Sequence, residues 1–405
     1  MSYDVAVVRA QYPALSDGRA WLDGAAGTQV PQAVIDAVSE TYRVGVSNQG
    51  APFEASARGT RIVAEARSAV ADLVGAQDPR GVVFGPTMTA LTYRFAAALG
   101  ATWRAGDEIV VTQLDHDANV RPWMQAAQRA GVTVRSAQVD PDTAELPTEA
   151  VVDLLGPRTR LVALTAASNL VGTLPDVKSI TAAAREAGAV SFVDGVHHCP
   201  HAFVDLAALG AHLYATSAYK WAGPHLAAVV AADPGLLERL EPDKLVPSPG
   251  SVPERFEIGT NAFASLAGVT AAVEHLAGLD DTAHGSRRER LAVSRRAANA
   301  HETELGARML DGLRRIPGVT LYGPTGARTP TAYFRVAGHA PAEIAAALSQ
   351  HGINCWHGHA YAWELAGALG LRDGGGAVRA GLSHYSSAAE ADRLLDAVTS
   401  LAAGA

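Results

Sequence analysis

Short apolar runs rich in β-branched residues alternate with longer segments of helical apolar spacing between about residues 81 and 233. The runs span residues 81–84, 108–112, 132–139, 160–165, 189–194, 213–217 and 227–232. Segments between them, such as 89–99 and 177–188, repeat their apolar residues every three or four positions, which is typical of amphipathic helices. Strands that alternate with helices predict βαβ units and a mostly parallel sheet covered on both faces.

The pattern changes after residue 246. A stretch rich in proline and glycine, 246–261, leads into long helical segments from about 265 to 315. Strand-like runs then return at 319–323, 331–337 and 377–383, with helices expected near 341–351 and 387–402. Because 405 residues exceed what one core usually holds, we predict two domains. A large domain spans 21–275, a connecting helix and smaller C-terminal α/β domain span 276–405, and residues 1–20 join the smaller domain.

Composition and charge exclude several classes of protein. The net charge is -8 and charges of both signs are interspersed, so no basic stripe suits nucleic acid. No apolar run reaches membrane-spanning length, and the first residues do not resemble a signal peptide. Two cysteines make a disulfide framework improbable and suit a reducing compartment. We therefore expect a cytoplasmic protein that acts on a small molecule.

The chain has only three lysines, and one of them stands in unusual surroundings. Lys220 follows a predicted strand and lies between two apolar runs, whereas Lys178 and Lys244 have polar neighbours. A partly desolvated amine has a lowered pKa and is more often neutral, as Schiff-base formation with an aldehyde requires. A lysine that extends from a strand end to solvent is the alternative, and position alone favours it. The neighbouring residues reverse that preference.

Two further features suit pyridoxal phosphate (PLP). Asp194 ends an apolar strand, where a carboxylate needs a cation or hydrogen bonds, and PLP needs an acid to keep its ring nitrogen protonated. The segment 85–89 (GPTMT) joins a strand to a helix and supplies hydroxyls and backbone N–H groups for a phosphate. A helix-capping role for Asp194 and an ordinary strand-to-helix turn are the alternatives.

Together these residues resemble the class V aminotransferase and cysteine desulfurase family of fold-type I PLP enzymes. The similarity is most specific over 194–225 (DGVHHCPHAFVDLAALGAHLYATSAYKWAGPH) and extends from 22–31 to 379–394. It implies the fold-type I architecture, with a mostly parallel seven-stranded sheet in the large domain and a smaller C-terminal α/β domain. It also implies PLP as the cofactor, an amino acid as the substrate, and a homodimer with shared active sites.

The resemblance also implies a role for individual positions. Lys220 is the Schiff-base lysine, Asp194 the partner of the pyridinium nitrogen and His116 the ring stacked on the cofactor, and these three are the expected catalytic residues. The other expected cofactor-binding residues are Thr87, Met88 (by its backbone), Asn169, His197, Ser217, Tyr219 and, from the second subunit, Thr260. The expected substrate-binding residues are Arg379, which binds the α-carboxylate, with Asn169, Trp356 and Tyr361.

One departure from the family pattern bears on the reaction. Cysteine desulfurases of the family carry a nucleophilic cysteine on a mobile loop, whereas Tyr361 occupies that position here and Cys355 lies six residues earlier (361 − 355 = 6). Trp356 replaces an arginine of that loop, and Tyr219 replaces the histidine before the lysine. A persulfide enzyme needs a thiolate that reaches the substrate sulfur. We interpret Cys355 as a buried structural residue.

These observations predict a PLP-dependent C–S β-lyase that cleaves cysteine or a cysteine S-conjugate. Residues 356, 361 and 363 are aromatic and are candidates for a wall around a bulky sulfur substituent, with simple packing as the alternative. Desulfuration through Cys355, transamination, epimerisation, and decarboxylation coupled to oxidative deamination stay open. A non-catalytic PLP-binding protein is the alternative from another class.

Two clusters invite other interpretations. The histidine-rich stretch 197–201 (HHCPH) lacks a second ligand pair at zinc-like spacing, and neighbours in an extended loop point in different directions. We therefore predict no metal site there. The charge-rich stretch 286–296 (SRRERLAVSRR) is explained by a solvated helix face.

Overall fold

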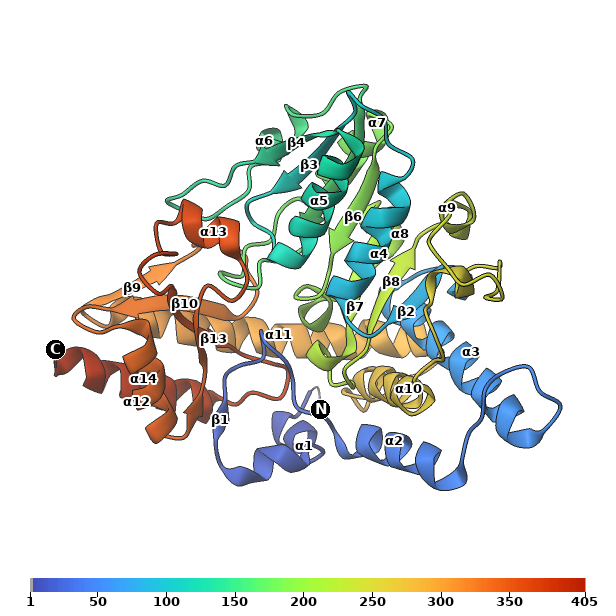
Figure 1. The fold of residues 1–405 in the computed structure, drawn as a ribbon. Coiled ribbons are helices and arrows are strands. Elements are labelled where there is room, and N and C mark those ends of the chain that lie inside the picture. Colours follow the sequence, from blue (N-terminus) through green and yellow to red (C-terminus); the bar gives the residue numbers. More distant parts are fainter. Residues whose placement is uncertain (1–2, 405) are drawn as a thin grey trace.

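The protein is described by a computed structural model that covers residues 3–404. Its centre is a seven-stranded sheet in the order β2-β8-β7-β6-β5-β3-β4 (Figure 1). The strands are β2 (Val82–Gly85), β3 (Glu108–Thr112), β4 (Thr133–Ala137), β5 (Thr159–Thr165), β6 (Val190–Asp194), β7 (Leu213–Ser217) and β8 (Ala227–Ala231). Each of the seven apolar runs of the sequence forms one of these strands. The predicted mostly parallel sheet is confirmed.

β8 is the exception to the parallel arrangement, because it pairs antiparallel with both β7 and β2. The connection from β7 to β8 is only residues 218–226, which is shorter than a parallel crossover needs. This short connection forms a 3-10 turn, Ala218–Lys220, and so places Lys220 immediately beyond the end of β7.

Two hydrophobic cores lie on opposite faces of the sheet. Neighbouring residues of one strand, such as Val110 and Val111 of β3, point to different cores because strand side chains alternate. α4 (Met88–Gly100) and α5 (Arg121–Ala130) cover one face. α3 (Glu54–Val74), α7 (Val177–Glu186) and α10 (Phe263–Ala277) cover the other. The strands other than the largely exposed edge strand β4 therefore read as continuous apolar runs rather than as alternating ones.

A smaller antiparallel sheet follows in the C-terminal part, in the order β12-β13-β10-β9. Its strands are β9 (Val319–Tyr322), β10 (Thr331–Val336), β12 (Trp356–Gly358) and β13 (Ala377–Gly381). α12 (Pro341–Gln350) and α14 (Ala388–Ala403) pack with this sheet around a third apolar core. A separate parallel pair joins β1 (Ala20–Trp21) to β11 (Ile353–Asn354).

α11 (Arg287–Arg315) is the longest helix of the described chain and runs from the large sheet to the small one (Figure 1). Its first turn carries a capping box in which Ser286 and Glu289 bind each other's backbone N–H groups. The helical segments expected between 265 and 315 are interrupted at 278–286, where α10 ends at Gly278 and the chain turns. The remaining helices are α1 (Val5–Arg9), α2 (Gln32–Val44), α6 (Thr148–Val152), α8 (Leu206–Leu209), α9 (Pro234–Glu238) and α13 (Trp363–Ala368).

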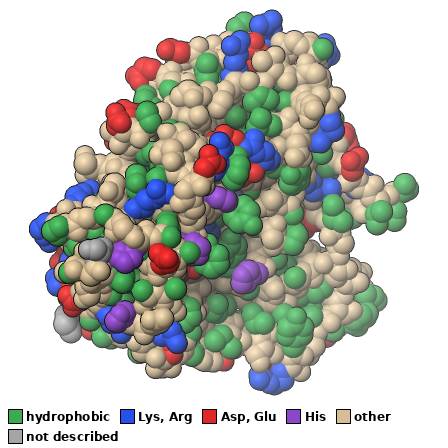
Figure 2. All heavy atoms as spheres, turned by 60° about the vertical axis from the view of Figure 1, so that its left-hand side comes forward, with side chains coloured by type: hydrophobic (Ala, Val, Ile, Leu, Met, Phe, Trp, Pro, Cys, Tyr) green, Lys and Arg blue, Asp and Glu red, His purple; other side chains and the backbone are tan. Residues whose placement is uncertain are grey.

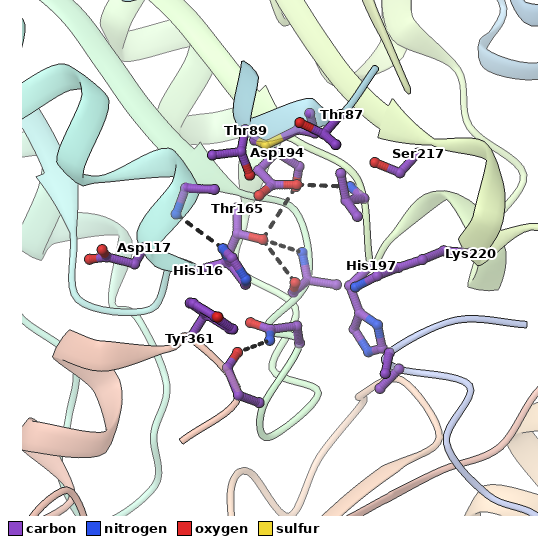
Figure 3. Close-up of a pocket in the computed structure, with 18 of the residues that line it drawn as sticks. Thr87, Thr89, His116, Asp117, Thr165, Asp194, His197, Ser217, Lys220 and Tyr361 are labelled. Atoms are coloured by element: carbon purple, nitrogen blue, oxygen red, sulfur yellow. Dashed lines mark hydrogen bonds between the residues drawn. The ribbon is translucent and has the colours of Figure 1, made fainter. Parts of the chain in front are cut away.

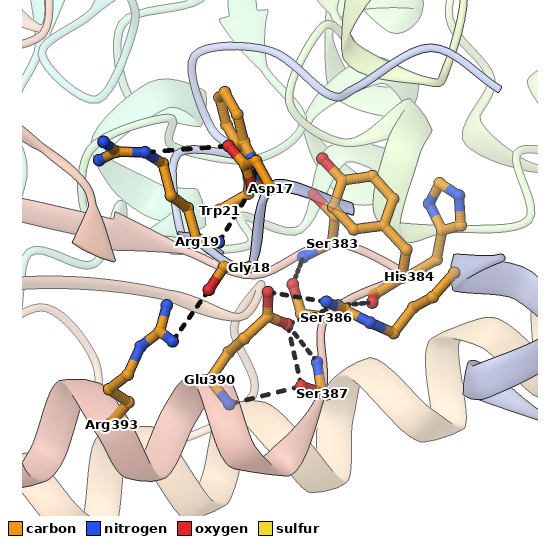
Figure 4. A network of polar contacts seen from close by, with 12 residues as sticks. Asp17, Gly18, Arg19, Trp21, Ser383, His384, Ser386, Ser387, Glu390 and Arg393 are labelled. Carbon is orange, nitrogen blue, oxygen red and sulfur yellow. Dashed lines mark hydrogen bonds and ion pairs between the residues drawn. The ribbon is translucent and has the colours of Figure 1, made fainter. Parts of the chain in front are cut away.

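The N-terminal segment is fixed to the C-terminal helix by polar contacts. Arg9 donates two hydrogen bonds to Glu390 of α14, at 2.6 and 3.2 Å. Arg393 donates to the carbonyl oxygen of Gly18 at 3.0 Å (Figure 4) and to that of Gly352 at 2.9 Å. These contacts attach the N-terminal segment to the C-terminal part of the chain, and the division into domains at residues 20 and 275 stays a prediction.

The surface carries charges of both signs. On the face shown in Figure 2, basic and acidic side chains are interspersed and no basic stripe forms among the described residues. Within residues 3–404, none of the helices combines the length and the apolar character that a membrane crossing demands.

Candidate active site

A cavity of about 600 Å³ lies at the carboxyl ends of the large-sheet strands, beside the small sheet (Figure 3). Ligands of open α/β sheets bind at this edge because the strand ends, loops and helix N-termini converge there. The residues predicted from the sequence that line it are Thr87, Met88, His116, Asn169, Asp194, His197, Ser217, Tyr219, Lys220, Trp356, Tyr361 and Arg379. Thr260 is exposed and does not line the cavity of its own chain.

Lys220 extends into the cavity from the turn that follows β7, and its side chain is buried. Burial is the main cause that lowers the pKa of Lys220 to about 8, and the positive charge of Arg379 acts in the same direction. A substantial fraction of this amine is therefore neutral near pH 7 to 8, which makes it a nucleophile and a base.

Asp194 ends β6 inside the cavity, and its Oδ1 accepts a hydrogen bond of 2.9 Å from the N–H of Val196. Burial raises the pKa of Asp194 to about 6, whereas the Val196 hydrogen bond acts in the opposite direction. A cation bound beside this carboxylate would stabilise its charged form and lower the pKa again. The carboxylate is therefore suited to hold a protonated ring nitrogen.

His116 lies after β3 in a turn that is held rigidly. Its Nδ1 accepts a hydrogen bond of 3.0 Å from the N–H of Ala118. Burial, followed by the charge of Lys220, lowers the pKa of His116 to about 3, so the ring is neutral at physiological pH. A neutral ring packs against a flat aromatic group without an added charge, which suits the predicted stacking role.

Asp115 holds this turn in place through hydrogen bonds, and it is not among the site residues predicted from the sequence. Its carboxyl group is buried and accepts hydrogen bonds from the Thr112 hydroxyl and, at 2.7 Å, from Asn119 Nδ2. Burial raises the pKa of Asp115 to about 8. The only signal in the sequence was its place directly before His116 in the stretch 114–119 (LDHDAN).

The N-terminus of α4 provides donors at another side of the cavity. Thr87 caps the helix, since its Oγ1 accepts a hydrogen bond of 3.1 Å from the N–H of Ala90. The N–H groups of Met88 and Thr89 form no hydrogen bond with residues 3–404. Figure 3 places Thr87, Thr89 and Ser217 at the same end of the cavity. Free N–H groups at a helix N-terminus bind phosphate well.

Arg379 enters from β13 of the small sheet and is buried. Its Nη1 donates to the carbonyl oxygen of Asn169 at 3.1 Å, and its Nη2 lies 3.5 Å from Asp23 Oδ1. Its Nε has no hydrogen-bond partner within the described chain. The guanidinium is thus positioned but incompletely paired, as expected for a group that binds a carboxylate. Asp23 was not selected from the sequence, although it lies in the stretch 22–31 that resembles the family.

His197 connects the cavity to the small sheet. Its Nε2 lies 3.1 Å from Thr329 Oγ1 and 3.0 Å from Thr331 Oγ1. Its Nδ1 is buried and has no partner among residues 3–404. Burial lowers the pKa of His197 well below its ordinary value, so the ring is neutral. The unpartnered Nδ1 is suited to a polar atom of a bound cofactor.

The loop 358–362 closes one side of the cavity and is fixed by backbone contacts. The carbonyl oxygen of Tyr361 accepts a hydrogen bond of 2.8 Å from the Asp117 N–H. Asn169 Nδ2 donates to the Ala360 carbonyl at 2.9 Å, and the Tyr333 hydroxyl donates to the Gly358 carbonyl at 2.8 Å. Ala360 and Tyr361 both adopt positive φ angles, 45° and 59°. The contacts hold this strained backbone in place, so that the side chain of Tyr361 lines the cavity.

Neither cysteine of the chain lines the cavity. Burial raises the pKa of Cys355 to about 12 and that of Cys199 to about 11, so neither thiol is ionised at neutral pH. Within residues 3–404, no three His, Cys, Asp or Glu side chains form a metal-binding group. His201 instead lies 3.1 Å from Glu302.

The sequence profile of the family described as "Aminotransferase class-V" matches residues 20–394. The chain belongs to this family. It is 38% identical over 402 residues to an uncharacterised protein of Mycobacterium tuberculosis, covering 99% of this chain and 100% of that protein. It is 34% identical to a probable cysteine desulfurase of Pseudomonas aeruginosa, with 95% of each chain covered. The structure of the cysteine desulfurase CsdA from Escherichia coli matches with a TM-score of 0.87 and 27% identity, covering 100% of this chain and 99% of that chain.

This class V aminotransferase family member is a PLP-dependent enzyme of the fold-type I architecture. The family, fold and cofactor predicted from the sequence are confirmed. The residues of the cavity fit the cofactor, because Lys220 suits its aldehyde and Asp194 its ring nitrogen. The unpartnered Nδ1 of His197 suits its phenolic oxygen, and the free N–H groups of Met88 and Thr89 suit its phosphate. The roles of the individual residues are proposals.

Proposed function

We propose that this enzyme is a lyase that breaks the bond between the β-carbon and sulfur of cysteine or a cysteine S-conjugate, without forming a persulfide on the protein. The observation that carries the proposal is the composition of the closing loop. Tyr361 lines the cavity at the position where the family's desulfurases carry a cysteine, and neither thiol of this chain lines it. A thiolate that cannot reach the substrate sulfur cannot accept it.

The cofactor and two side chains supply the chemistry at the α-carbon. When bound, PLP supplies an aldehyde that condenses with amino groups and a pyridinium ring that withdraws electrons from the neighbouring carbon. Asp194 keeps the proton on the ring nitrogen through its negative charge. The amine of Lys220, whose pKa is lowered to about 8, removes the proton from the substrate α-carbon.

The substrate is oriented by its carboxylate. The planar guanidinium of Arg379 binds two carboxylate oxygens, and the hydrogen bond from Nη1 to the Asn169 carbonyl fixes its orientation. Asn169 also holds the closing loop through Ala360, so substrate binding and loop position share one residue. This arrangement orients the α-hydrogen and the sulfur substituent relative to Lys220.

Elimination of the sulfur substituent then follows. The electron pair of the broken Cα–H bond forms a Cα=Cβ double bond, and the Cβ–S bond breaks with its electrons leaving on sulfur. The proton now held by Lys220 neutralises the leaving thiolate. The released 2-aminoacrylate reacts with water to give pyruvate and ammonia. No step of this sequence uses an enzyme cysteine.

The closing loop and the neighbouring strand β12 supply an aromatic wall for the sulfur substituent. Trp356 and Tyr361 are 56% and 69% exposed and both line the cavity, so apolar surface remains available to a ligand. Arg121 also lines this cavity, and it is ion-paired with Asp117 at 2.8 Å and with Glu364. Because its charge is already neutralised, we propose that this side favours an apolar, uncharged substituent.

We further propose that the enzyme works as a homodimer that shares its active sites. The helix N-terminus that suits the cofactor phosphate is open, since Thr87 and Thr89 are exposed. Thr260 is also exposed and lies outside the cavity of its own chain. Thr260 of the partner subunit would cover the phosphate. Sedimentation should give a dimer, and Thr260→Ala should weaken cofactor binding without changing the sedimentation coefficient.

The lyase proposal is tested by product analysis. The holoenzyme is incubated with cysteine and a panel of S-alkyl and S-aryl cysteines, and pyruvate, ammonia and thiol are measured. We expect equal amounts of the three products, and unchanged rates in the Cys199→Ala and Cys355→Ala variants. Absence of pyruvate and thiol across the panel would contradict the proposal.

Cysteine desulfuration is the second candidate, favoured by the names of similar proteins such as the probable cysteine desulfurase of Pseudomonas aeruginosa. In that case cysteine is converted to alanine, and its sulfur is transferred to an enzyme thiol. Mass spectrometry of the holoenzyme after exposure to cysteine would then find an extra sulfur on Cys355. The Cys355→Ala variant would produce no alanine.

A further inference from the structure

A second cavity of about 350 Å³ lies beside the active-site cavity. It is formed by α11, the segment 198–203 and the segment 328–330, which precedes β10. Thr329 lines this cavity and also contacts His197 of the active site at 3.1 Å. The two cavities therefore share one wall. Nothing in the proposed lyase reaction uses the second cavity.

Arg295 of α11 is the central feature of this cavity. The stretch that contains it was expected to form a solvated helix face, yet Arg295 is only 1% exposed, so that expectation is wrong at this position. Its Nη2 donates to the carbonyl oxygens of Pro200 and, at 3.4 Å, of Cys199. Its Nε and Nη1 form no hydrogen bond within the described chain. A buried guanidinium with unsatisfied donors is costly, and an anion in the cavity would satisfy them.

The remaining charges of the lining are also positive. Arg328 binds the carbonyl oxygens of Pro324 and Thr331 through its two terminal nitrogens, and its Nε is buried without a partner among residues 3–404. Arg296 lies at the exposed rim. No Asp or Glu side chain belongs to the lining formed by the described residues.

Glu302, a buried acid of the same helix, does not form an ion pair with Arg295 within the described residues. Its carboxylate instead lies 3.1 Å from His201 Nδ1. The lining thus combines three guanidinium groups with no carboxylate among the described residues. This excess of positive charge favours a ligand with two negative charges.

From this arrangement we infer that the second cavity is a binding site for a small dianionic oxyanion, such as phosphate or sulfate. The Nη1 amino group of Arg295 carries two N–H bonds without a partner in the described chain, which suit an oxygen of a tetrahedral anion. Arg328 and Arg296 complete the positive surroundings. This site differs from the position of the cofactor phosphate, which lies at the N-terminus of α4.

The test is calorimetric titration of the fully PLP-loaded holoenzyme with sodium phosphate and, separately, with sodium sulfate. Ionic strength is kept constant with sodium chloride in a zwitterionic buffer. Full loading keeps the cofactor phosphate position occupied. We expect saturable binding of one anion per chain. Absence of saturable binding of either anion would overturn the inference, since water alone would then fill the cavity.

Two matched variants on α11 distinguish anion binding in the cavity from a general effect of surface charge. Ala300 is exposed and lines the cavity mouth, whereas Ala307 is exposed on the same helix outside the lining. We expect Ala300→Glu to weaken binding by roughly tenfold through like-charge repulsion, and Ala307→Glu to change it little. Arg295→Gln should abolish binding, and Ala300→Glu keeps the test valid if that buried variant fails to fold. Equal effects of the two glutamate variants, or no effect of Ala300→Glu, would overturn the inference.

Discussion

The imidazole of His116 lies against the phenol ring of Tyr361, with ring centroids 5.4 Å apart and planes inclined by only 24°. His116 lies in the turn after β3 of the large sheet and Tyr361 lies in the loop before α13, so this contact joins the two parts of the molecule. A backbone hydrogen bond from Asp117 to the Tyr361 carbonyl holds the same junction. The loop 358–362 is thereby tied to the wall of the cavity.

The Tyr361 ring should determine how well bulky substrates bind. Tyr361→Ala removes aromatic contact worth about 0.5–1.5 kcal/mol, so KM for S-aryl cysteines should increase by roughly threefold to tenfold. The kcat should change less, because Lys220 and Asp194 are untouched. Tyr361→Phe retains the ring and serves as the matched control. Steady-state kinetics on S-aryl and S-methyl cysteine measures the effect, and an equal loss on both substrates would refute a role in substituent binding.

Coenzyme attachment to Lys220 should depend on pH. The neutral amine is the reactive form, and it predominates above its lowered pKa of about 8. The rate at which apoenzyme forms its PLP absorbance band should therefore rise as pH increases through 8 and level off above it. Stopped-flow absorbance measures this rate. Lys220→Ala should show no borohydride-stable attachment of the coenzyme, and modification of Lys178 or Lys244 instead would contradict the assignment.

The charge of Asp194 should be essential for turnover. Asp194→Asn removes the carboxylate that we propose as the partner of the ring nitrogen, and we expect kcat to fall on the order of a hundredfold or more. Asp115→Asn is the matched control, since Asp115 is buried nearby and its pKa is raised to about 8, which keeps it mostly neutral at pH 7. Comparable losses in the two variants would indicate a structural cause, and circular dichroism checks that both are folded.

Arg379 should recognise the α-carboxylate of the substrate. Lysine keeps the charge but loses the planar fork, so Arg379→Lys should raise KM for cysteine conjugates by roughly tenfold or more. The KM for analogues without the carboxylate should change little in this variant. The ratio of kcat/KM for a conjugate and its decarboxylated analogue reports this preference. An unchanged ratio in the variant would show that another group binds the carboxylate.

A buried ion pair should stabilise the segment that leads to Thr260. Arg67 donates to both oxygens of Glu257 at 2.8 and 2.9 Å, and both side chains are buried. Arg67→Met leaves the Glu257 carboxylate unpaired, which should cost about 3–5 kcal/mol of unfolding free energy. Adding Glu257→Gln removes that charge while it can still accept the Phe84 N–H, so part of the stability should return. Urea unfolding compares the two variants, and equal midpoints would contradict this account.

The sequence by itself determined the strands, the cofactor and many of the residues that line the cavity. Each apolar run of the large sheet became a strand, because a sheet buried on both faces requires such runs locally. Lys220 and Asp194 were recognisable because each polar group directly follows or ends an apolar strand, where only a function or a partner explains it. The direction of β8 was not predicted, although its short connection to β7 leaves room for nothing but an antiparallel pairing.

Only the tertiary structure decided which distant segments meet. Arg379 contacts Asn169 across 210 positions of sequence, and His197 contacts Thr329 across 132. It also revealed that Arg295 is buried inside a second cavity, whereas its charged neighbours in sequence indicated a solvated surface. The reason is physical: periodicity reports which face of one helix or strand is apolar, whereas the partner of a buried charge is set by packing between elements far apart in the chain.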